Sequence, residues 1–208
     1  MKNKIFAILA AILLVFGAFW CFGGNGGDIV LKERVFFKVK NSLDVQVQGK
    51  SEGKVAESII QLSRTFTWTD SSGQVAASAR TAIVSWGTEI NVYDGKGAKV
   101  GSIEERVFSS WFRTWSTYDI KDASGKQLAV SEKSEWFGTT ITLTSPSGAV
   151  VAELDRPWIN IWSDTWNVYI KKPGVVDNGI LVMIAAFKTA SDRDHEGDSS
   201  SDKTPKKK

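Results

Sequence analysis

The chain has 208 residues, of which 42% are hydrophobic and 24% charged, and its formal net charge is +3. This length suits one domain with a sizeable core plus tails, and the mild charge excludes the concentrated basic stripe of a nucleic-acid-binding protein. One cysteine, Cys21, excludes an intrachain disulfide, and one histidine, His195, excludes Ser-His-Asp triads and His-rich metal sites.

The N-terminus carries an uncharged apolar run, residues 5–22, preceded by Lys2 and Lys4. A basic stretch followed by an apolar run is the pattern of a signal peptide or a signal anchor. The run has about the length that spans a bilayer, which favours a retained anchor, with cleavage after Gly17 or Gly23 as the alternative. We therefore expect residues 1–22 to make the protein either single-pass membrane-anchored or exported.

The charges that flank this apolar run bear on its orientation. Lys2 and Lys4 favour a cytoplasmic N-terminus, which would place the folded domain outside the cytoplasm. Basic residues between Lys32 and Lys40 favour the reverse, so both orientations stay open, with the first preferred. The Gly-rich residues 23–28 are expected to form a flexible linker to the folded domain.

From residue 29 onwards, short β-type segments alternate with turn signals. In one such segment, Phe66 and Trp68 alternate with threonines, which is the period of two of a half-buried strand. Four turns repeat one pattern, in which Asp or Ser is followed by two residues and then by Gly. The Asp or Ser caps the turn and Gly adopts the left-handed conformation, so each repeat predicts a hairpin. The glycines are Gly73, Gly97, Gly125 and Gly148.

One segment near the C-terminus breaks this strand pattern. Asp177 or Asn178 can cap a helix that runs through residues 180–187, which are apolar on every side and about 8–10 residues long. Such a helix is too short to span a bilayer and is expected to be buried. We therefore predict a mainly β fold over residues 29–190, a closed antiparallel barrel of about 12 strands around a central hydrophobic C-terminal helix, preceded by an N-terminal apolar helix. A disordered polar tail is expected over residues 191–208.

The order of these features resembles the LURP-one-related branch of the Tubby C-terminal-like superfamily, which is related to phospholipid scramblases. The resemblance rests on residues 33–40, on the repeated Asp-x-x-Gly hairpins and on the apolar helix after Asp177. It implies a 12-stranded barrel around a central C-terminal helix. Because related Tubby proteins bind phosphoinositides and related scramblases act at membranes, it also implies phospholipid binding.

Tryptophans supply the candidate ligand-binding residues. Trp158, Trp162 and Trp166 share one face of a continuous strand, where they would line a hydrophobic pocket or a lipid interface. The favoured alternative is that they fill the gap between barrel wall and helix. A second group would stack an arginine on two aromatic rings, again with a structural role preferred. This second group comprises Trp111, Arg113 and Trp115.

Basic residues near the ends of the domain supply candidates for contact with a membrane surface. Each lysine or arginine close to anionic lipid contributes about 1 kcal/mol to binding. The favoured alternative is a solvated surface. The candidates are Lys32, Arg34, Lys38, Lys171 and Lys172.

Paired carboxylates are the only candidates for catalysis. Glu104 and Glu105 are adjacent in a predicted strand, so their side chains point to opposite faces. Glu153 and Asp155 share a face but precede Arg156, which favours an ion pair over acid–base chemistry. We therefore assign no catalytic residue, no metal and no cofactor.

The sequence thus predicts a membrane-tethered or exported, non-enzymatic β-barrel that binds a lipid or protein partner, and no nucleic acid. One alternative is a structural or interaction module of the cell envelope without a ligand. A second alternative is a small-molecule binder or hydrolase that uses the tryptophan-rich face.

Overall fold

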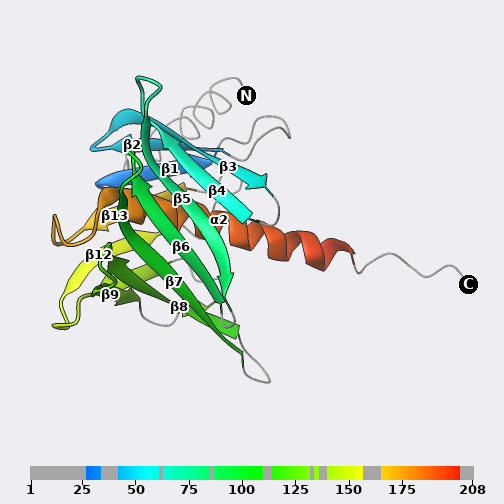
Figure 1. The fold of residues 1–208 in the computed structure, drawn as a ribbon. Helices are drawn as coiled ribbons and strands as arrows, with labels where there is room; N and C mark the ends of the chain where they lie inside the picture. Colours follow the sequence, from blue (N-terminus) through cyan, green and yellow to red (C-terminus); the bar gives the residue numbers. More distant parts are fainter. Residues whose placement is uncertain are drawn as a thin grey trace, which may run out of the picture.

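Thirteen strands and one helix make up the part of the chain that the computed structural model describes (Figure 1). The described residues are 27–33, 42–60, 63–84, 87–109, 114–131, 134–135, 140–156 and 165–201. The strands are β1 (Ile29–Glu33), β2 (Ser42–Val47), β3 (Lys50–Ile60), β4 (Ser63–Thr69), β5 (Val75–Val84), β6 (Gly87–Asp94), β7 (Lys99–Ser109), β8 (Thr114–Asp122), β9 (Gln127–Ser131), β10 (Ser134–Glu135), β11 (Thr140–Thr144), β12 (Val150–Asp155) and β13 (Thr165–Ile170), and the helix is α2 (Asn178–Ser201).

Twelve of these strands close into one antiparallel barrel. Hydrogen-bonded neighbours follow the order β8-β7-β6-β5-β4-β3-β2-β1-β13-β12-β11-β9, and β9 pairs back onto β8. The short strand β10 also pairs with β8. β1 lies between β2 and β13, with Leu31 opposite both Val45 and Trp166, so the first and last strands are neighbours in the wall. The predicted closed barrel of about 12 strands is confirmed.

The four repeated turns lie together at one end of the barrel, which we call the turn end. Their glycines have φ between 82° and 87°, the left-handed conformation that the Asp/Ser-x-x-Gly pattern predicts. In the turn after β8, the carboxylate of Asp122 accepts backbone N–H bonds from Ser124 at 2.9 Å and from Lys126 at 3.0 Å, and Gly125 N–H donates to the Asp122 carbonyl. The predicted hairpins are therefore confirmed together with their capping chemistry.

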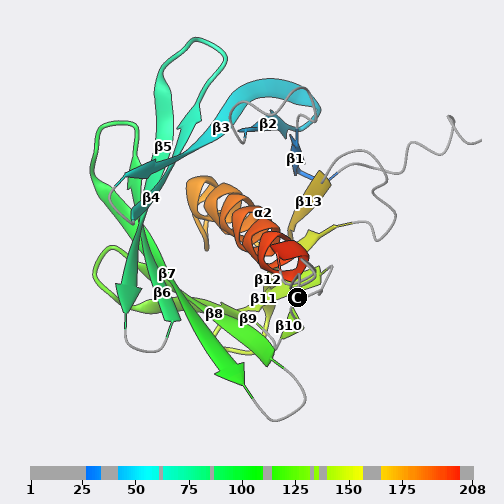
Figure 2. The same cartoon turned by 90° about the vertical axis from the view of Figure 1, so that its right-hand side faces the viewer.

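Helix α2 enters at the turn end and runs through the barrel (Figure 2). The Asp177 carboxylate accepts the Gly179 N–H at 2.7 Å, which caps the first turn of the helix. Residues 180–186 are all buried, so their apolar side chains form the centre of the core. A Cβ on Gly101 of β7 would lie 2.8 Å from Ile180 Cδ1 and 2.3 Å from the Lys121 carbonyl oxygen, so glycine is required where the helix passes this strand. The predicted central helix is confirmed.

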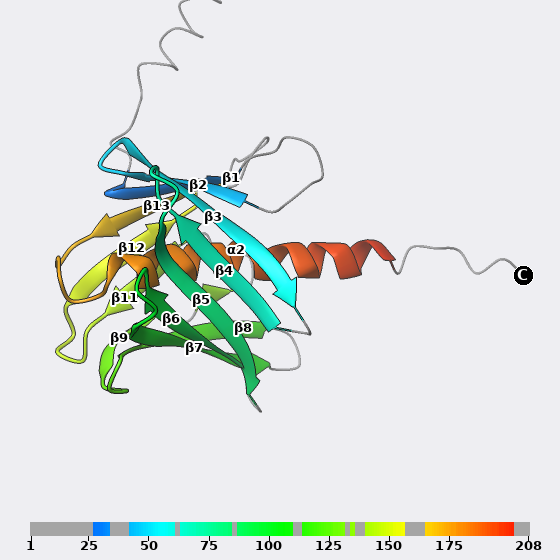
Figure 3. The same cartoon turned by 45° about the horizontal axis from the view of Figure 1, so that its top comes forward.

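The helix is longer than the sequence predicts. It continues to Ser201 and projects past the strands at the end opposite the turns, which we call the mouth (Figure 3). A tail was expected from Ser191 because the residues there are polar. In the structure Asp192 and Arg193 form ion pairs with the barrel wall, which fixes their part of the helix. The predicted N-terminal apolar helix lies outside the described residues.

The turn carboxylates predict how stability depends on acid. The pKa of Asp122 is lowered from its usual 3.8, first by the Ser124 hydroxyl and then by the Lys126 N–H. The pKa of Asp70 is lowered in the same way, by the Ser72 hydroxyl and the Gln74 N–H. A carboxyl group whose pKa is lower in the folded state stabilises the fold above its unfolded pKa, and this stabilisation is lost as the pH falls through the folded pKa. Asp70→Asn with Asp122→Asn is therefore expected to reduce the loss of unfolding free energy between about pH 5 and pH 2, measured by urea denaturation.

The control for this experiment is Ser124→Ala, which keeps the Asp122 carboxylate but removes its hydroxyl donor at 2.6 Å. It should reproduce part of the effect of the double variant. An acid dependence that stays unchanged in the double variant would contradict the capping role of these carboxylates.

Candidate functional site

The inward-facing positions of the barrel change from apolar to charged near the mouth. On β1, Ile29 and Leu31 are fully buried, and Glu33 follows two residues later on the same face. On β3, the buried Val55 is followed in the same way by Glu57. We call the resulting ring of side chains the charged belt. It comprises Glu33, Glu57, Arg64, Glu105 and Arg156 from the wall and Lys188, Asp192 and Arg193 from α2.

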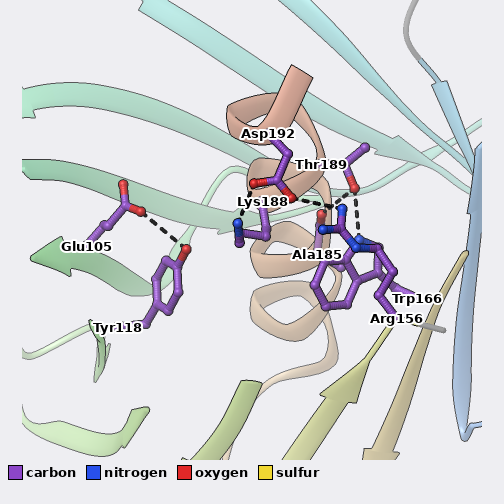
Figure 4. Close-up of polar contacts among 8 residues, drawn as sticks. All are labelled: Glu105, Tyr118, Arg156, Trp166, Ala185, Lys188, Thr189 and Asp192. Atoms are coloured by element: carbon purple, nitrogen blue, oxygen red, sulfur yellow. Dashed lines mark hydrogen bonds and ion pairs between the residues drawn. The ribbon is translucent and has the colours of Figure 1, made fainter. Parts of the chain in front are cut away.

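On one side of α2, the belt is held by a buried triad of charges (Figure 4). Asp192 pairs through one carboxylate oxygen with the ammonium group of Lys188, one helical turn earlier. Its other oxygen lies 2.8 Å from the Arg156 guanidinium group, which follows β12. The three side chains are at most 15% exposed. The helix is therefore joined to the wall by one acid shared between two bases.

Trp166 lies directly beside this triad. Its indole N–H donates to the Thr189 hydroxyl at 2.9 Å, and this hydroxyl donates to the Ala185 carbonyl at 2.9 Å (Figure 4). The Arg156 guanidinium lies 5.1 Å from the centre of the indole ring. Because Trp166 is fully buried, it fills the space between wall and helix, which is the structural interpretation of this candidate.

On the other side of α2, Arg193 reaches two strands. Its guanidinium lies 3.1 Å from the Glu57 carboxylate and 3.5 Å from that of Glu33. Glu57 also pairs with Arg64 of β4 at 3.4 Å, and its side chain is only 6% exposed. The cavity beside these groups has about 10 Å³, which is room for at most one water molecule.

The belt is balanced in charge, since its four basic and four acidic residues cancel. Glu33, Glu57 and Asp192 each contact a base, and Glu105 accepts the Tyr118 hydroxyl at 3.2 Å (Figure 4). Within the described residues, no three His, Cys, Asp or Glu side chains are grouped so as to hold a metal ion. The arrangement joins α2 to the barrel wall on two sides.

The other carboxylates that were weighed for catalysis lie on both faces of the wall. Glu104 pairs with Lys121 on the outer face, whereas Glu105 points inward, so the expectation that they face apart is confirmed. The expected ion pair of Glu153 or Asp155 with Arg156 is wrong. Glu153 pairs with Lys171 at 2.9 Å, and Asp155 accepts the Thr140 hydroxyl, because Arg156 points inward to the helix.

The described membrane-surface candidates lie at opposite ends of the barrel. Lys32 of β1 is exposed and lies opposite Thr165, the first residue of β13. Lys171 and Lys172 follow the last residue of β13 and are exposed at the turn end. The six-residue step from Thr165 to Lys171 corresponds to about 20 Å of extended chain, so these lysines do not form one patch.

Most of the remaining candidates lie outside the described residues. Trp115 is on β8, opposite Phe108 of β7 and Glu135 of β10, and only its backbone is described. The candidates outside the described residues are Arg34, Lys38, Trp111, Arg113, Trp158 and Trp162.

Sequence reasoning missed the charged belt itself. One signal was present, because the inward-facing positions of several strands end in a charged residue. A second signal was the spacing of Lys188 and Asp192, which places opposite charges on one face of a helix.

No protein-family model matches the chain, and no curated protein or solved structure matches it significantly. The fold alone defines the class of protein: a closed twelve-stranded antiparallel β-barrel around a C-terminal helix. Across the described ranges, no helix combines the length and apolar composition that crossing a membrane requires. The apolar residues 5–22 lie outside these ranges.

Proposed function

We propose that the protein is a membrane-tethered or exported, non-enzymatic barrel that binds a lipid or protein partner on its outer surface. The observation that carries this proposal is the filling of the barrel by α2, whose residues 180–190 are all buried. Since the helix and the balanced belt occupy the lumen, a partner has to bind at the ends or on the outer wall.

The apolar N-terminal run supports the tether. Residues 5–22 carry no charge, and the chain then reaches the wall through a short Gly-rich stretch. At the wall, Asp28 is fixed by two contacts: its carboxylate accepts the Ile170 N–H at 2.6 Å, and its carbonyl accepts the Gln48 N–H at 2.8 Å. A tether in residues 1–22 would therefore be joined to a defined place on the barrel.

The chain connections favour the mouth as the end that meets a protein partner. β7 ends and β8 begins at the mouth, and so do β12 and β13. The connections between these strand pairs carry the candidates Trp111, Trp158 and Trp162. Tryptophan is one of the residues most enriched in the binding hot spots of protein interfaces.

We also propose that the chain is a member of the LURP-one-related branch of the Tubby C-terminal-like superfamily. The closed barrel and its buried C-terminal helix support this relationship, because both follow from the resemblance. Fold alone does not identify a ligand, so the lipid and the protein partner have to be separated by experiment.

Extraction of membranes with alkaline carbonate tests the tether. An anchored chain should stay in the membrane pellet at the full 22.8 kDa, whereas an exported one should be released at a smaller mass. A full-length protein that carbonate releases would contradict both forms of the proposal.

Co-sedimentation tests the lipid partner. A chain that begins at Asp28 is mixed with vesicles of neutral or of anionic phospholipid. Binding to either supports a lipid ligand for the barrel itself. Failure to bind both, with a cooperative melt that shows the barrel to be folded, removes the lipid ligand and leaves the protein partner, for which cross-linking of the full chain in membranes is the test.

A further inference from the structure

We propose that the turn end of the barrel is the surface that contacts the lipid headgroups, so that the mouth is directed away from the membrane. This inference rests on the proposed tether and adds which face of the barrel meets the bilayer. It follows from where the chain joins the wall, from the reach of the linker and from the charges exposed at the turn end.

The tether joins the barrel at the turn end. β1 begins there, with Ile29 opposite Val47 and Val168, the residues near the turn-end limits of β2 and β13. Gly27 is buried just before β1, and a Cβ on it would lie 2.6 Å from the Val168 backbone. Together with the two hydrogen bonds of Asp28, this tight packing holds residues 27–28 of the predicted linker 23–28 against the wall.

The linker is too short to turn the barrel over. Residues 23–26 span at most about 14 Å when fully extended. The eleven residues of β7 extend over about 36 Å along the strand, and a strand tilt of about 40° leaves a wall about 28 Å high. With residues 5–22 in the bilayer, the turn end therefore stays close to the headgroups, and the mouth cannot reach them with the barrel upright.

The described exposed charges at the turn end are mostly basic, seven lysines against Asp28 and Asp177, which suits an anionic lipid surface. The turn carboxylates are directed back into their own turns: Asp70 accepts the N–H groups of Ser72 and Gln74, and Asp94 accepts those of Lys96 and Ala98. The lysines of this end are exposed to solvent, where each would contribute about 1 kcal/mol near anionic lipid. These lysines are Lys50, Lys54, Lys96, Lys99, Lys126, Lys171 and Lys172.

Energy transfer to labelled headgroups tests the orientation in the full chain. In a Cys21→Ser background, a donor dye is placed on Lys126→Cys at the turn end or on Ile59→Cys near the mouth, where Ile59 is 64% exposed. The protein is reconstituted in vesicles of mixed neutral and anionic phospholipid that carry a headgroup acceptor. Transfer is expected to be several-fold stronger from position 126. Equal transfer, or stronger transfer from position 59, would overturn the proposal.

Charge reversal gives a second, independent readout. Lys96→Glu with Lys172→Glu should reduce transfer from position 126 in anionic vesicles and leave it unchanged in neutral ones. Lys32→Glu is the matched control, because Lys32 is also exposed but lies towards the mouth. A larger effect from the control would refute the assignment of the turn end.

The same samples separate failure of the orientation from failure of the tether. Protein that resists carbonate extraction from the vesicles but transfers energy best from position 59 contradicts the orientation alone. Protein that carbonate removes contradicts the tether, and the orientation with it.

Discussion

Ile184→Asp is expected to leave the barrel unfolded. Ile184 is fully buried in the apolar part of α2 that runs inside the barrel, surrounded by the apolar inner face of the wall. An unpaired carboxylate there costs several kcal/mol in desolvation, and the lost apolar contacts add about 2–5 kcal/mol. Together these terms approach the whole stability of a typical domain, about 5–15 kcal/mol. Far-ultraviolet circular dichroism and thermal melting of the purified variant measure the effect.

A matched variant at the same position separates charge from packing. Ile184→Val removes one methylene group and is expected to remain folded, with a loss of about 0.5–1.5 kcal/mol in unfolding free energy. If Ile184→Asp melted cooperatively at the wild-type temperature, α2 would not be an essential part of the core.

The fold was predictable because the turn residues of each hairpin and the apolar run of the helix both indicate the same closed barrel. Each hairpin was specified within a few residues by an Asp or Ser cap and a glycine in the left-handed region, as at Asp122 and Gly125. The central helix was predictable because an apolar run of this length has only the core as its environment. The end of α2 was missed because Asp192 and Arg193 are polar, and composition alone cannot show that their partners lie on distant strands.

The positions of the candidate residues were harder to predict, because they depend on how distant strands pair. Strand alternation already places Arg156 on the face opposite Glu153 and Asp155, and the expected ion pair did not take this into account. Which of the two faces points inward depends on the register of the strand, because a shift of one residue exchanges them. Nor could sequence show that Lys32 and Lys171 lie at opposite ends, since that depends on β1 pairing antiparallel with β13. The burial of Lys188 was not predicted because a lysine after an apolar helix is usually exposed, and here it is buried beside Asp192.

The charged belt explains how an apolar helix finds one position in an apolar lumen. Because residues 180–187 are apolar on every side, displacement by one turn, about 5.4 Å, would still leave apolar side chains in contact with the wall. Such a displacement would break the buried ion pairs of Asp192 with Arg156 and of Arg193 with Glu57. We infer that the belt sets the depth and rotation of α2, in the way that buried polar groups select register in other helical assemblies.

Asp192→Ala is expected to destabilise the protein by about 3–5 kcal/mol. The change leaves the bases Lys188 and Arg156 close together, buried, and without the acid that they share. Urea denaturation of wild type and variant, followed by tryptophan fluorescence, measures the difference. Trp166 reports on the site directly, because Arg156 lies over its ring.

Two comparisons make the Asp192 result specific to the buried triad. Glu153→Gln breaks the half-exposed pair with Lys171 and should cost at most about 1 kcal/mol.

A triple variant replaces the triad by apolar side chains: Lys188→Met, Asp192→Leu and Arg156→Met. It should regain most of the stability lost in Asp192→Ala. If the triple variant is as stable as wild type but its α2 occupies more than one position, seen as doubled Trp166 indole resonances, the belt selects position rather than supplying stability. Equal losses for Asp192→Ala and Glu153→Gln would show that the triad is no more important than a surface ion pair.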